Sequence, residues 1–313
     1  MKTLKLLLLA STLLSAAPVD YNGRWNIKLD HARRRVWWLE VNAAGTPAMN
    51  GAFVGAPGGQ VDKIPEIRME GDTLVFKFTR KGRNERVVEL VYKAKFEGGV
   101  LNGETVESVN GAAKPVVKWT GYRAPVIMDK DDGSWVEGKP VALLDGKSMN
   151  GWSWVVKDGP GWVVENGLLK NQKGASDLVS DAKFWNFILK TEYRYDKGSN
   201  SGVGVRGRYE IQIIDDYGRD MTTHGTATLY SRVLPSAKPV KPAGEWQSMD
   251  IRVVGRQLSV WVNGVQVHDK TQIDGLTAIA IDADEDKPGP LVFQGDHGLI
   301  EFRKIEVTPL VKR

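Results

Sequence analysis

Short strand-like segments separated by turn residues account for almost all of this 313-residue chain. Between Arg24 and Thr120 about eight apolar runs, such as RVWWLEV and DTLVFKF, alternate with turn compositions such as GAPGG and KGRN. The strand pattern resumes at Pro140, and Asn263-Gly264, between LSVWV and VQVH, is a strong signal for a two-residue hairpin. The sequence therefore predicts an all-β protein.

The spacing of these segments predicts two β domains. Eight strands in ~100 residues with short connections favour a small β-barrel or rolled sheet over residues 18–123, and its opening GRWNI resembles the Gly-x-Trp opening of lipocalins. Residues 124–139 mix Pro, Gly and acidic residues without periodicity, which is typical of a linker. Residues 140–313 contain many antiparallel strands with loops of uneven length, which favours a two-sheet jelly roll.

The N-terminal residues predict export. Lys2 and Lys5 flank the start of an apolar run at residues 6–14, and small residues follow at positions 15–17. This is the pattern of a secretory signal peptide over residues 1–17, too short to span a membrane, and no later apolar run approaches the ~20 residues of a transmembrane helix. We therefore expect a periplasmic or secreted protein without a membrane span.

The amino-acid composition excludes some kinds of site and argues against one class of binding partner. The chain has no cysteine, which excludes disulfides, thiolate metal sites and a lipoprotein anchor. The net charge is +5, yet the only dense basic run is Arg33-Arg34-Arg35, which is more typical of a solvated strand end than of a nucleic-acid-binding surface. We expect no nucleic-acid partner, and the sequence leaves the oligomeric state open.

The segment VGVRGRYEIQIID, residues 203–215, separates apolar from polar side chains. On a regular strand one face would carry Val203, Val205, Tyr209, Ile211 and Ile213. The opposite face would carry Arg206, Arg208, Glu210 and Gln212. Such a row on an inner strand of a jelly roll suits sugar hydroxyls or a reacting carbonyl, and an exposed ion-paired face is the alternative interpretation.

Further carboxylates lie near these strands. Asp215 follows Glu210 by five residues, so it reaches the same side only through a bulge or by lying beyond the strand end. Two carboxylates can divide acid and base roles when about 5 to 9 Å apart. In the closing segment each register mixes apolar and charged residues, which indicates twist or a bulge near Arg303. Glu301 and Arg303 would then be neighbours that either line a cleft or form a rim ion pair.

His297 is the strongest candidate for chemistry among the four histidines. It follows Asp296 at a hairpin end, and an imidazole there can act as general base, general acid or metal ligand. An ordinary hairpin turn is the alternative interpretation. His224 lies in the polar loop DMTTHGTATLY, which could overhang a cleft, whereas His31 and His268 are expected to face solvent.

A divalent cation is one alternative for this chemistry. The candidate ligands are His297, Asp296 and Glu210, which would suit a borderline or hard ion. Their spacing does not demand a metal, so no cofactor is required. The chain shows no Ser–His–Asp order, no phosphate-binding glycine loop and no His-Glu-x-x-His helix.

The segment from Leu143 to Leu310 resembles the 3-keto-disaccharide hydrolase family, concanavalin A-like jelly rolls common in exported bacterial proteins. The resemblance rests on blocks in order, among them LLDGKSMNGW, WVVENGLL, GSNSGVGVRGRYEIQIIDDYG and GPLVFQGDHGLIEFRKIEV. It implies an enzyme acting on sugars oxidised at C3, whose ketone acidifies the hydrogen on C2. A base removes that hydrogen, the enolate expels the C1 substituent, and water adds back, for net hydrolysis.

Chemical fit to these motifs suggests roles. Glu210 or His297 would be the base, Asp296 would orient the imidazole, and Arg206 or a bound divalent ion would stabilise the enolate oxygen. The residues expected to hold or surround the substrate are Gln212, Arg208, Asp215, Glu301, Arg303 and His224.

Two other functions fit the sequence. One is a non-catalytic carbohydrate-binding protein, because jelly rolls often only bind. The other is a conventional glycoside hydrolase of the laminarinase-like fold class, whose strand signature is Glu-x-Asp-x-x-Glu. Here the equivalent is Glu210-Ile-Gln212-Ile-Ile-Asp215, and Gln cannot tune a neighbouring carboxyl as a charged Asp does. That difference argues against a retaining glucanase mechanism.

Overall fold

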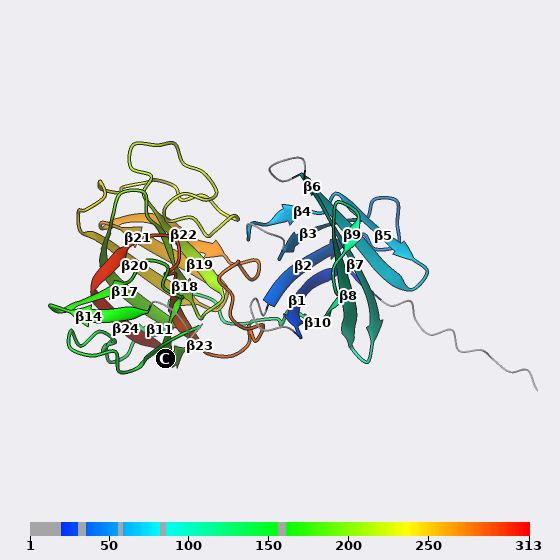
Figure 1. Ribbon diagram of the computed structural model, residues 1–313. Helices are drawn as coiled ribbons and strands as arrows, with labels where there is room; N and C mark the ends of the chain where they lie inside the picture. The colour runs from blue at the N-terminus through cyan, green and yellow to red at the C-terminus, as the bar shows by residue number, and fades with distance from the viewer. Residues whose placement is uncertain (1–19, 31–35, 56–58, 82–85, 156–160) are drawn as a thin grey trace, which may run out of the picture.

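The computed structural model describes residues 20–30, 36–55, 59–81, 86–155 and 161–313. The proposed signal peptide, His31 and the arginine run at 33–35 lie outside these residues. The described residues form strands, turns and irregular segments without a helix, which confirms the all-β prediction. None of their elements is an apolar helix of membrane-spanning length. The strands form two separate halves, seen side by side in Figure 1.

The first half is one antiparallel sheet of ten strands, in the order β4-β3-β2-β1-β10-β8-β7-β6-β5 with β9 beside β8. Its strands are β1 (Gly23–Leu29), β2 (Val36–Asn42), β3 (Asn50–Val54), β4 (Asp62–Lys63), β5 (Glu66–Glu70), β6 (Thr73–Lys81), β7 (Val87–Glu97), β8 (Val100–Val109), β9 (Ala112–Ala113) and β10 (Val117–Arg123). Among the described residues no ladder joins β4 to β5, so we call this half the rolled sheet.

Aromatic side chains fill the inside of the rolled sheet. Phe76 stacks on Tyr92 with ring centroids 4.4 Å apart, and Phe53 lies edge-on to Tyr92 at 4.9 Å. Trp37 packs on the same rings, whereas Trp38 points to the other side of β2 and joins the core of the second half. Adjacent strand residues face opposite ways, so Trp37 lies inside the rolled sheet and Trp38 at its interface with the second half.

The second half consists of two sheets. A nine-stranded sheet has the order β14-β15-β24-β17-β20-β21-β22, with β11 and β12 on β24, and a five-stranded sheet has the order β13-β16-β23-β18-β19. The strands are β11 (Trp135–Glu137), β12 (Val141–Ala142), β13 (Trp152–Trp154), β14 (Trp162–Glu165), β15 (Leu168–Asn171), β16 (Leu178–Phe184), β17 (Phe187–Tyr195), β18 (Asn200–Val205), β19 (Tyr209–Ile214), β20 (Gln247–Val254), β21 (Gln257–Val262), β22 (Val265–Gln272), β23 (Gly289–Phe293) and β24 (Ile300–Lys312).

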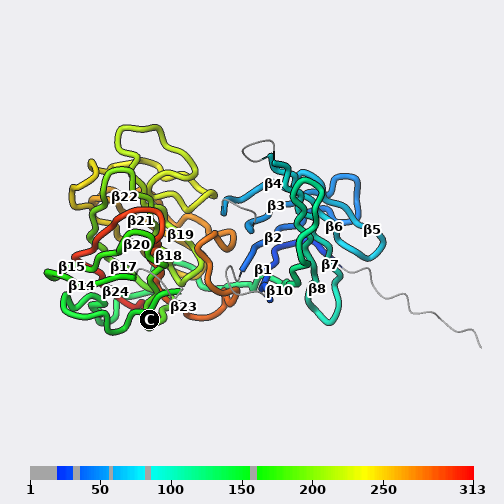
Figure 2. Tube along the Cα trace, in the orientation of Figure 1, coloured from blue at the N-terminus to red at the C-terminus, as the bar shows by residue number. Residues whose placement is uncertain are grey.

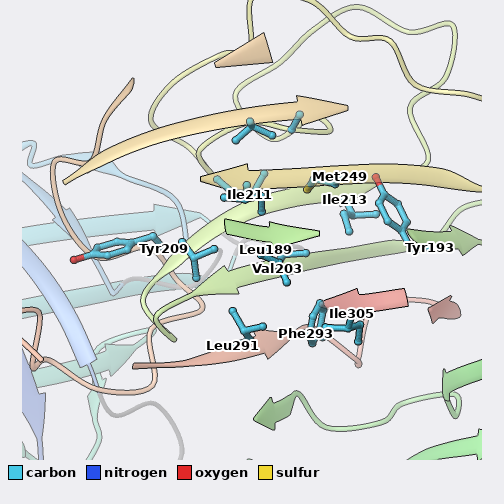
Figure 3. Packing of buried hydrophobic residues seen from close by; sticks show 14 of the residues in the cluster. Leu189, Tyr193, Val203, Tyr209, Ile211, Ile213, Met249, Leu291, Phe293 and Ile305 are labelled. Atoms are coloured by element: carbon cyan, nitrogen blue, oxygen red, sulfur yellow. The ribbon is translucent and has the colours of Figure 1, made fainter. Parts of the chain in front are cut away.

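These two sheets enclose one hydrophobic core, as a jelly roll requires. Figure 3 shows Val203 and Ile211 of the five-stranded sheet among core residues that include Leu189 and Met249 of the nine-stranded sheet. The predicted inward face of the 203–213 segment is therefore confirmed. Because strand side chains alternate, Glu210 and Gln212 lie on the outer face of the five-stranded sheet.

Two local predictions can be compared with the strand pairing. Asn263 and Gly264 both have positive φ between Val262 and Val265, which is the hairpin turn expected for this dipeptide. Where β17 pairs with β24 the register shifts so that Arg303 has no partner, which confirms the expected bulge. The predicted linker is not irregular throughout, because β11 lies within residues 124–139 and pairs with β24. The exact domain boundaries stay a prediction.

Candidate active site

Glu210 lies over a strip of β18 that has no side chains. Gly204 is paired with Glu210 and Gly202 with Gln212, so both glycines lie on the face that carries Glu210. A Cβ atom on Gly202 would lie 2.6 Å from Oε1 of Glu210. The two glycines therefore provide the space that the Glu210 carboxyl occupies.

The polar face continues across the neighbouring strands. Phe293 pairs with both Val203 and Leu178, and all three point into the core. The adjacent residues Gln294 and Asp177 consequently lie on the Glu210 face. The Gln294 N–H donates to the Gly202 carbonyl (3.0 Å), and Asp177 Oδ1 accepts a hydrogen bond from the Gly295 N–H (3.1 Å).

The turn between β23 and β24 carries Asp296 and His297, whose side chains are both about half exposed. Nδ1 of His297 hydrogen-bonds Oδ1 of Asp296, which leaves Nε2 as the ring nitrogen outside this bond. The His297 carbonyl accepts from the N–H of Asn200, the first residue of β18 (3.2 Å). The turn is thus attached to the strand that contains the glycine strip.

The Glu210 carboxyl has an unusual protonation equilibrium. Burial raises its pKa to about 8, and repulsion from Asp177 and Asp296 adds to the effect. Glu210 is 3% exposed. At neutral pH the carboxyl is therefore mostly protonated. The Asp296 side chain thus lies within electrostatic range of Glu210.

A polar loop borders the open side of β19. The Gln212 amide donates to the His224 carbonyl (3.3 Å), and the Tyr230 N–H donates to the Glu210 carbonyl (3.0 Å). The His224 ring lies edge-on to the Tyr230 ring with centroids 5.2 Å apart. The loop around His224 thus lies beside Glu210 and Gln212, and its expected place over a cleft stays a prediction.

Three amide oxygens on this face are buried without a hydrogen-bond partner among the described residues. They belong to Asn200, Gln212 and Gln294. Leaving a buried acceptor unpaired costs about 1–3 kcal/mol, so such groups in a folded protein call for an explanation. These three oxygens are thus polar acceptors clustered around Glu210.

Residues 139–308, more than half of the chain, match the family of 3-keto-alpha-glucoside-1,2-lyase-like domains. The chain belongs to this family. It is 28% identical to the 3-keto-disaccharide hydrolase of Bacteroides thetaiotaomicron, over 36% of this chain and 52% of that protein. The chain thus spans about half the length of this curated relative.

Solved structures give further similarities to the lyase-like domain. A Parabacteroides distasonis protein classed with the glycosyl hydrolases is 23% identical, covers 59% of this chain and 91% of its own, and has a TM-score of 0.47. The carbohydrate-binding module CBM66 of Bacillus subtilis is 11% identical, covers 50% of this chain and 94% of its own, and has a TM-score of 0.35.

The Arg206 side chain does not point into the candidate site around Glu210. It lies in the turn before β19 with φ of +54°, so it leaves the strand alternation. Its guanidinium donates to the carbonyls of Trp185 (2.6 Å) and Gly255 (2.8 Å) and to Oδ1 of Asn186 (2.9 Å). It also lies 4.1 Å over the Trp185 ring. These contacts tie turns together, and the prediction that Arg206 stabilises the enolate is wrong.

Arg208 and Asp215 also point to other partners. Nε of Arg208 donates to Asp282 (2.6 Å) and Nη1 to the Lys287 carbonyl (2.9 Å), which anchors the loop before β23. Asp215 follows the end of β19, and its Oδ2 accepts from the Gly198 N–H (2.8 Å) in the turn before β18. Neither side chain takes the substrate-binding place predicted for it.

Glu301 and Arg303 lie on the other sheet. They belong to β24 of the nine-stranded sheet and do not pair with each other. Glu301 pairs with Arg194, whereas Nε of Arg303 donates to Oε2 of Glu192 (2.5 Å). The bulge at Arg303 shifts the register between them. The expected pairing of Glu301 with Arg303 is therefore wrong, and because both lie on the other sheet they are not neighbours of Glu210.

His268 is buried rather than solvent-facing. Its Nε2 donates to the Ala227 carbonyl (2.8 Å), and Nδ1 lies 3.1 Å from Oγ1 of Thr271. Burial lowers the pKa of His268, so the neutral ring is the favoured form. This histidine supports the loop that carries His224 and takes no place in the site.

The metal prediction is not supported by the donor set. Within the described ranges no group of three or more His, Asp or Glu side chains is arranged to hold a metal ion. The divalent cation stays a prediction, and we derive no step through it.

Sequence reasoning missed Asp177, Asn200 and Gln294. Because side chains alternate along a strand, Asp177 must face the side opposite to Leu178, and Gln294 the side opposite to Phe293. That signal shows only that they are polar-face residues. Which strands are neighbours, and hence which polar residues meet, comes from the pairing of β16, β23 and β18.

Replacing Glu210 tests its protonation. A carboxyl whose pKa is about 8 when folded and near its ordinary 4.5 when unfolded binds more protons in the folded state, so stability falls as pH rises between those values. Glu210→Gln removes this penalty. We expect its melting temperature to exceed that of the unmodified protein at pH 8, with a smaller difference at pH 5. Equal differences at both pH values would contradict the assignment, and Glu107→Gln, an exposed ion-pair partner, is the control.

Proposed function

We propose that this protein cleaves 3-keto glycosides by removing the C2 hydrogen, expelling the C1 substituent and adding water. The family description and the named relative support this substrate class and this type of reaction. One observation carries the proposal, namely a buried carboxyl, whose pKa burial raises to about 8, on the strands next to a turn with an aspartate-bound imidazole. These are the proton donor and the proton acceptor that an elimination needs.

The imidazole of His297 is the base in this proposal. Asp296 holds Nδ1, which fixes the ring and favours the cation that forms when Nε2 takes the proton from C2. The electron pair of the broken C–H bond passes into the enolate of the C3 ketone. As the ketone re-forms, a C1–C2 double bond is made and the C1–O bond breaks.

Glu210 supplies the proton to the departing oxygen. Its raised pKa keeps the proton on the carboxyl at neutral pH, and the nearby Asp177 and Asp296 strengthen that preference. Water then adds across the double bond, its hydroxyl to C1 and a proton to C2. The sum of the two stages is hydrolysis. Of the two bases that the sequence left open, our proposal therefore takes His297.

The amides of Asn200, Gln212 and Gln294 are suited to hold the sugar. Their buried oxygens lack partners among the described residues, and sugar hydroxyls are donors. Amide groups on the same side chains can donate to the C3 oxygen, the role that Arg206 does not fill. We assign these residues to substrate binding.

The two alternative functions make different demands. A laminarinase-type hydrolase needs the last carboxyl of its signature to act together with Glu210, but the equivalent Asp215 is bound to the turn before β18. A binding protein needs only the amides. Incubation with 4-nitrophenyl glucoside and with its 3-keto form separates them. Cleavage of the keto form alone agrees with our proposal, cleavage of both with a conventional hydrolase, and binding without turnover with a binding module.

We also propose that the protein acts after export, on the basis of residues 1–17. When it is produced in a bacterium, the mature chain should begin at about residue 18 in a fraction outside the cytoplasm. Intact mass and N-terminal sequencing of that fraction test this, and a full-length chain in the cytoplasm would refute it.

The leaving group distinguishes the acid from the base. With a sugar as leaving group, Glu210→Gln should lower kcat by about 10²-fold or more, because the departing oxygen needs a proton. With 4-nitrophenolate, which departs without being protonated, the loss of kcat in Glu210→Gln should be only a few-fold. His297→Asn should lose about 10²-fold with both substrates, since C2–H removal precedes departure in each case. If instead the loss in Glu210→Gln did not depend on the leaving group and the loss in His297→Asn did, Glu210 would be the base and His297 the acid.

The glycine strip offers a test of how Glu210 is placed. In Gly202→Ala the new Cβ would lie 2.6 Å from Oε1 of Glu210, so the carboxyl must move. Misplacement of about 1 Å can cost about 10²-fold in rate, and we expect a loss of that order with a folded protein. Gly121→Ala, which crowds Leu101 in the rolled sheet at 3.1 Å, is the matched control and should keep its turnover. Full activity of Gly202→Ala would show that the carboxyl needs no such placement.

A further inference from the structure

The segment between β22 and β23 lies between the two halves of the molecule, as the orange part of the chain shows in Figures 1 and 2. We call residues 274–285 of this segment the strap. One side of the strap contacts the rolled sheet, and the other contacts β19 and its preceding turn. It therefore connects the rolled sheet with the strand that carries Glu210.

Alternate residues of β1 hold the strap from the rolled-sheet side. Arg24 pairs with Asp274 (3.1 Å) and Lys28 with Asp284 (2.9 Å). Between them, the buried Asn26 side chain donates to the Ala283 carbonyl (3.1 Å) and to Glu285. Both ends of the strap are thus attached to β1.

The other side of the strap covers the site. Oγ1 of Thr277 accepts from the Glu210 N–H (2.9 Å), and the Thr277 N–H donates to the Arg208 carbonyl (3.0 Å). The Ile279 side chain lies against Gly204, where a Cβ would be 3.1 Å from Cγ2. Because Gly204 is paired with Glu210, Ile279 packs on the glycine strip directly beside the position of Glu210.

Glu285, at the end of the strap, is fully buried and is the centre of a polar network. It accepts two hydrogen bonds from Arg256 (2.8 and 3.0 Å) and one from the Tyr209 hydroxyl (2.7 Å). Asn26 supplies a further hydrogen bond (2.7 Å) from the rolled sheet. Removing one partner of a buried carboxylate is costly, so this network fixes the strap and Tyr209, the neighbour of Glu210.

We propose that the rolled sheet is a positioning element of the Glu210 site, which it serves by holding the strap against β19 through Arg24, Asn26 and Lys28. This rests on the proposed function of Glu210 as proton donor. When the strap loosens, water reaches the carboxyl while Asp177 and Asp296 stay in place. The pKa of Glu210 then falls from about 8 toward 4.5, and the donor loses its proton at neutral pH.

Two variants of β1 test the proposal. Arg24→Ala/Lys28→Ala removes the two partly exposed ion pairs to the strap, and Asn26→Ala removes the hydrogen bonds to Ala283 and Glu285. The control is Lys77→Ala/Lys95→Ala, which removes two partly exposed ion pairs of the rolled sheet that do not involve the strap. Hydrogen–deuterium exchange follows residues 274–285 and 209–214, and kcat is measured against pH.

Both β1 variants should exchange faster in the strap and in β19. The high-pH limb of kcat should move about one pH unit lower, with kcat at pH 7.5 reduced about 3-fold and KM changed less. The control should match the unmodified protein. Unchanged strap exchange overturns the proposal, and so does faster exchange with the pH limb in its original position, because the strap would then have only a structural role.

A failure of the proposed function can be told apart from a failure of this inference. If the unmodified protein does not turn over 3-keto glycosides, exchange is measured together with the stabilisation that Glu210→Gln gives at pH 8. Introducing Glu210→Gln into the Asn26→Ala background should then give less stabilisation than in the unmodified background. Equal stabilisation in both backgrounds would show that the strap does not control the environment of Glu210.

Discussion

The burial of the Glu210 carboxyl beside two other carboxylates is the constraint on which the rest of the site depends. A charged carboxylate is costly in such surroundings, so the group keeps its proton and its pKa rises to about 8. The two arginines that precede it in sequence do not offset this, because Arg206 and Arg208 are bound to turns and loops elsewhere. A protonated carboxyl is what proton donation to a leaving oxygen requires.

Three parts of the surrounding structure contribute to the environment of the Glu210 carboxyl. Below the carboxyl, Gly202 and Gly204 leave a strip of bare backbone on β18. Beside it, the Asp296–His297 turn is attached to the start of β18 through the bond between the His297 carbonyl and the Asn200 N–H. Over it, the strap places Ile279 against the glycine strip and is itself held by β1 of the rolled sheet. The N-terminal half is on this account a working part of the site.

Strand alternation predicted a good part of this arrangement from sequence. It placed Val203, Ile211 and Ile213 in the core and left Glu210 and Gln212 on the polar face, because side chains on a regular strand alternate strictly. It failed for Arg206 and Arg208, since a turn with positive φ interrupts the strand there. It also failed for Glu301 and Arg303 and missed Asp177, because strand pairing between distant segments is not encoded in local pattern.

A carbon-13 NMR titration of the Glu210 carboxyl tests the central claim most directly. Its signal, assigned by comparison with Glu210→Gln, follows the protonation of this one group across pH. A midpoint near 8 is the predicted result. A midpoint near 4.5, the ordinary value for glutamate, would show a charged and hydrated carboxylate and would contradict both the proton-donor role and the water-excluding role of the strap.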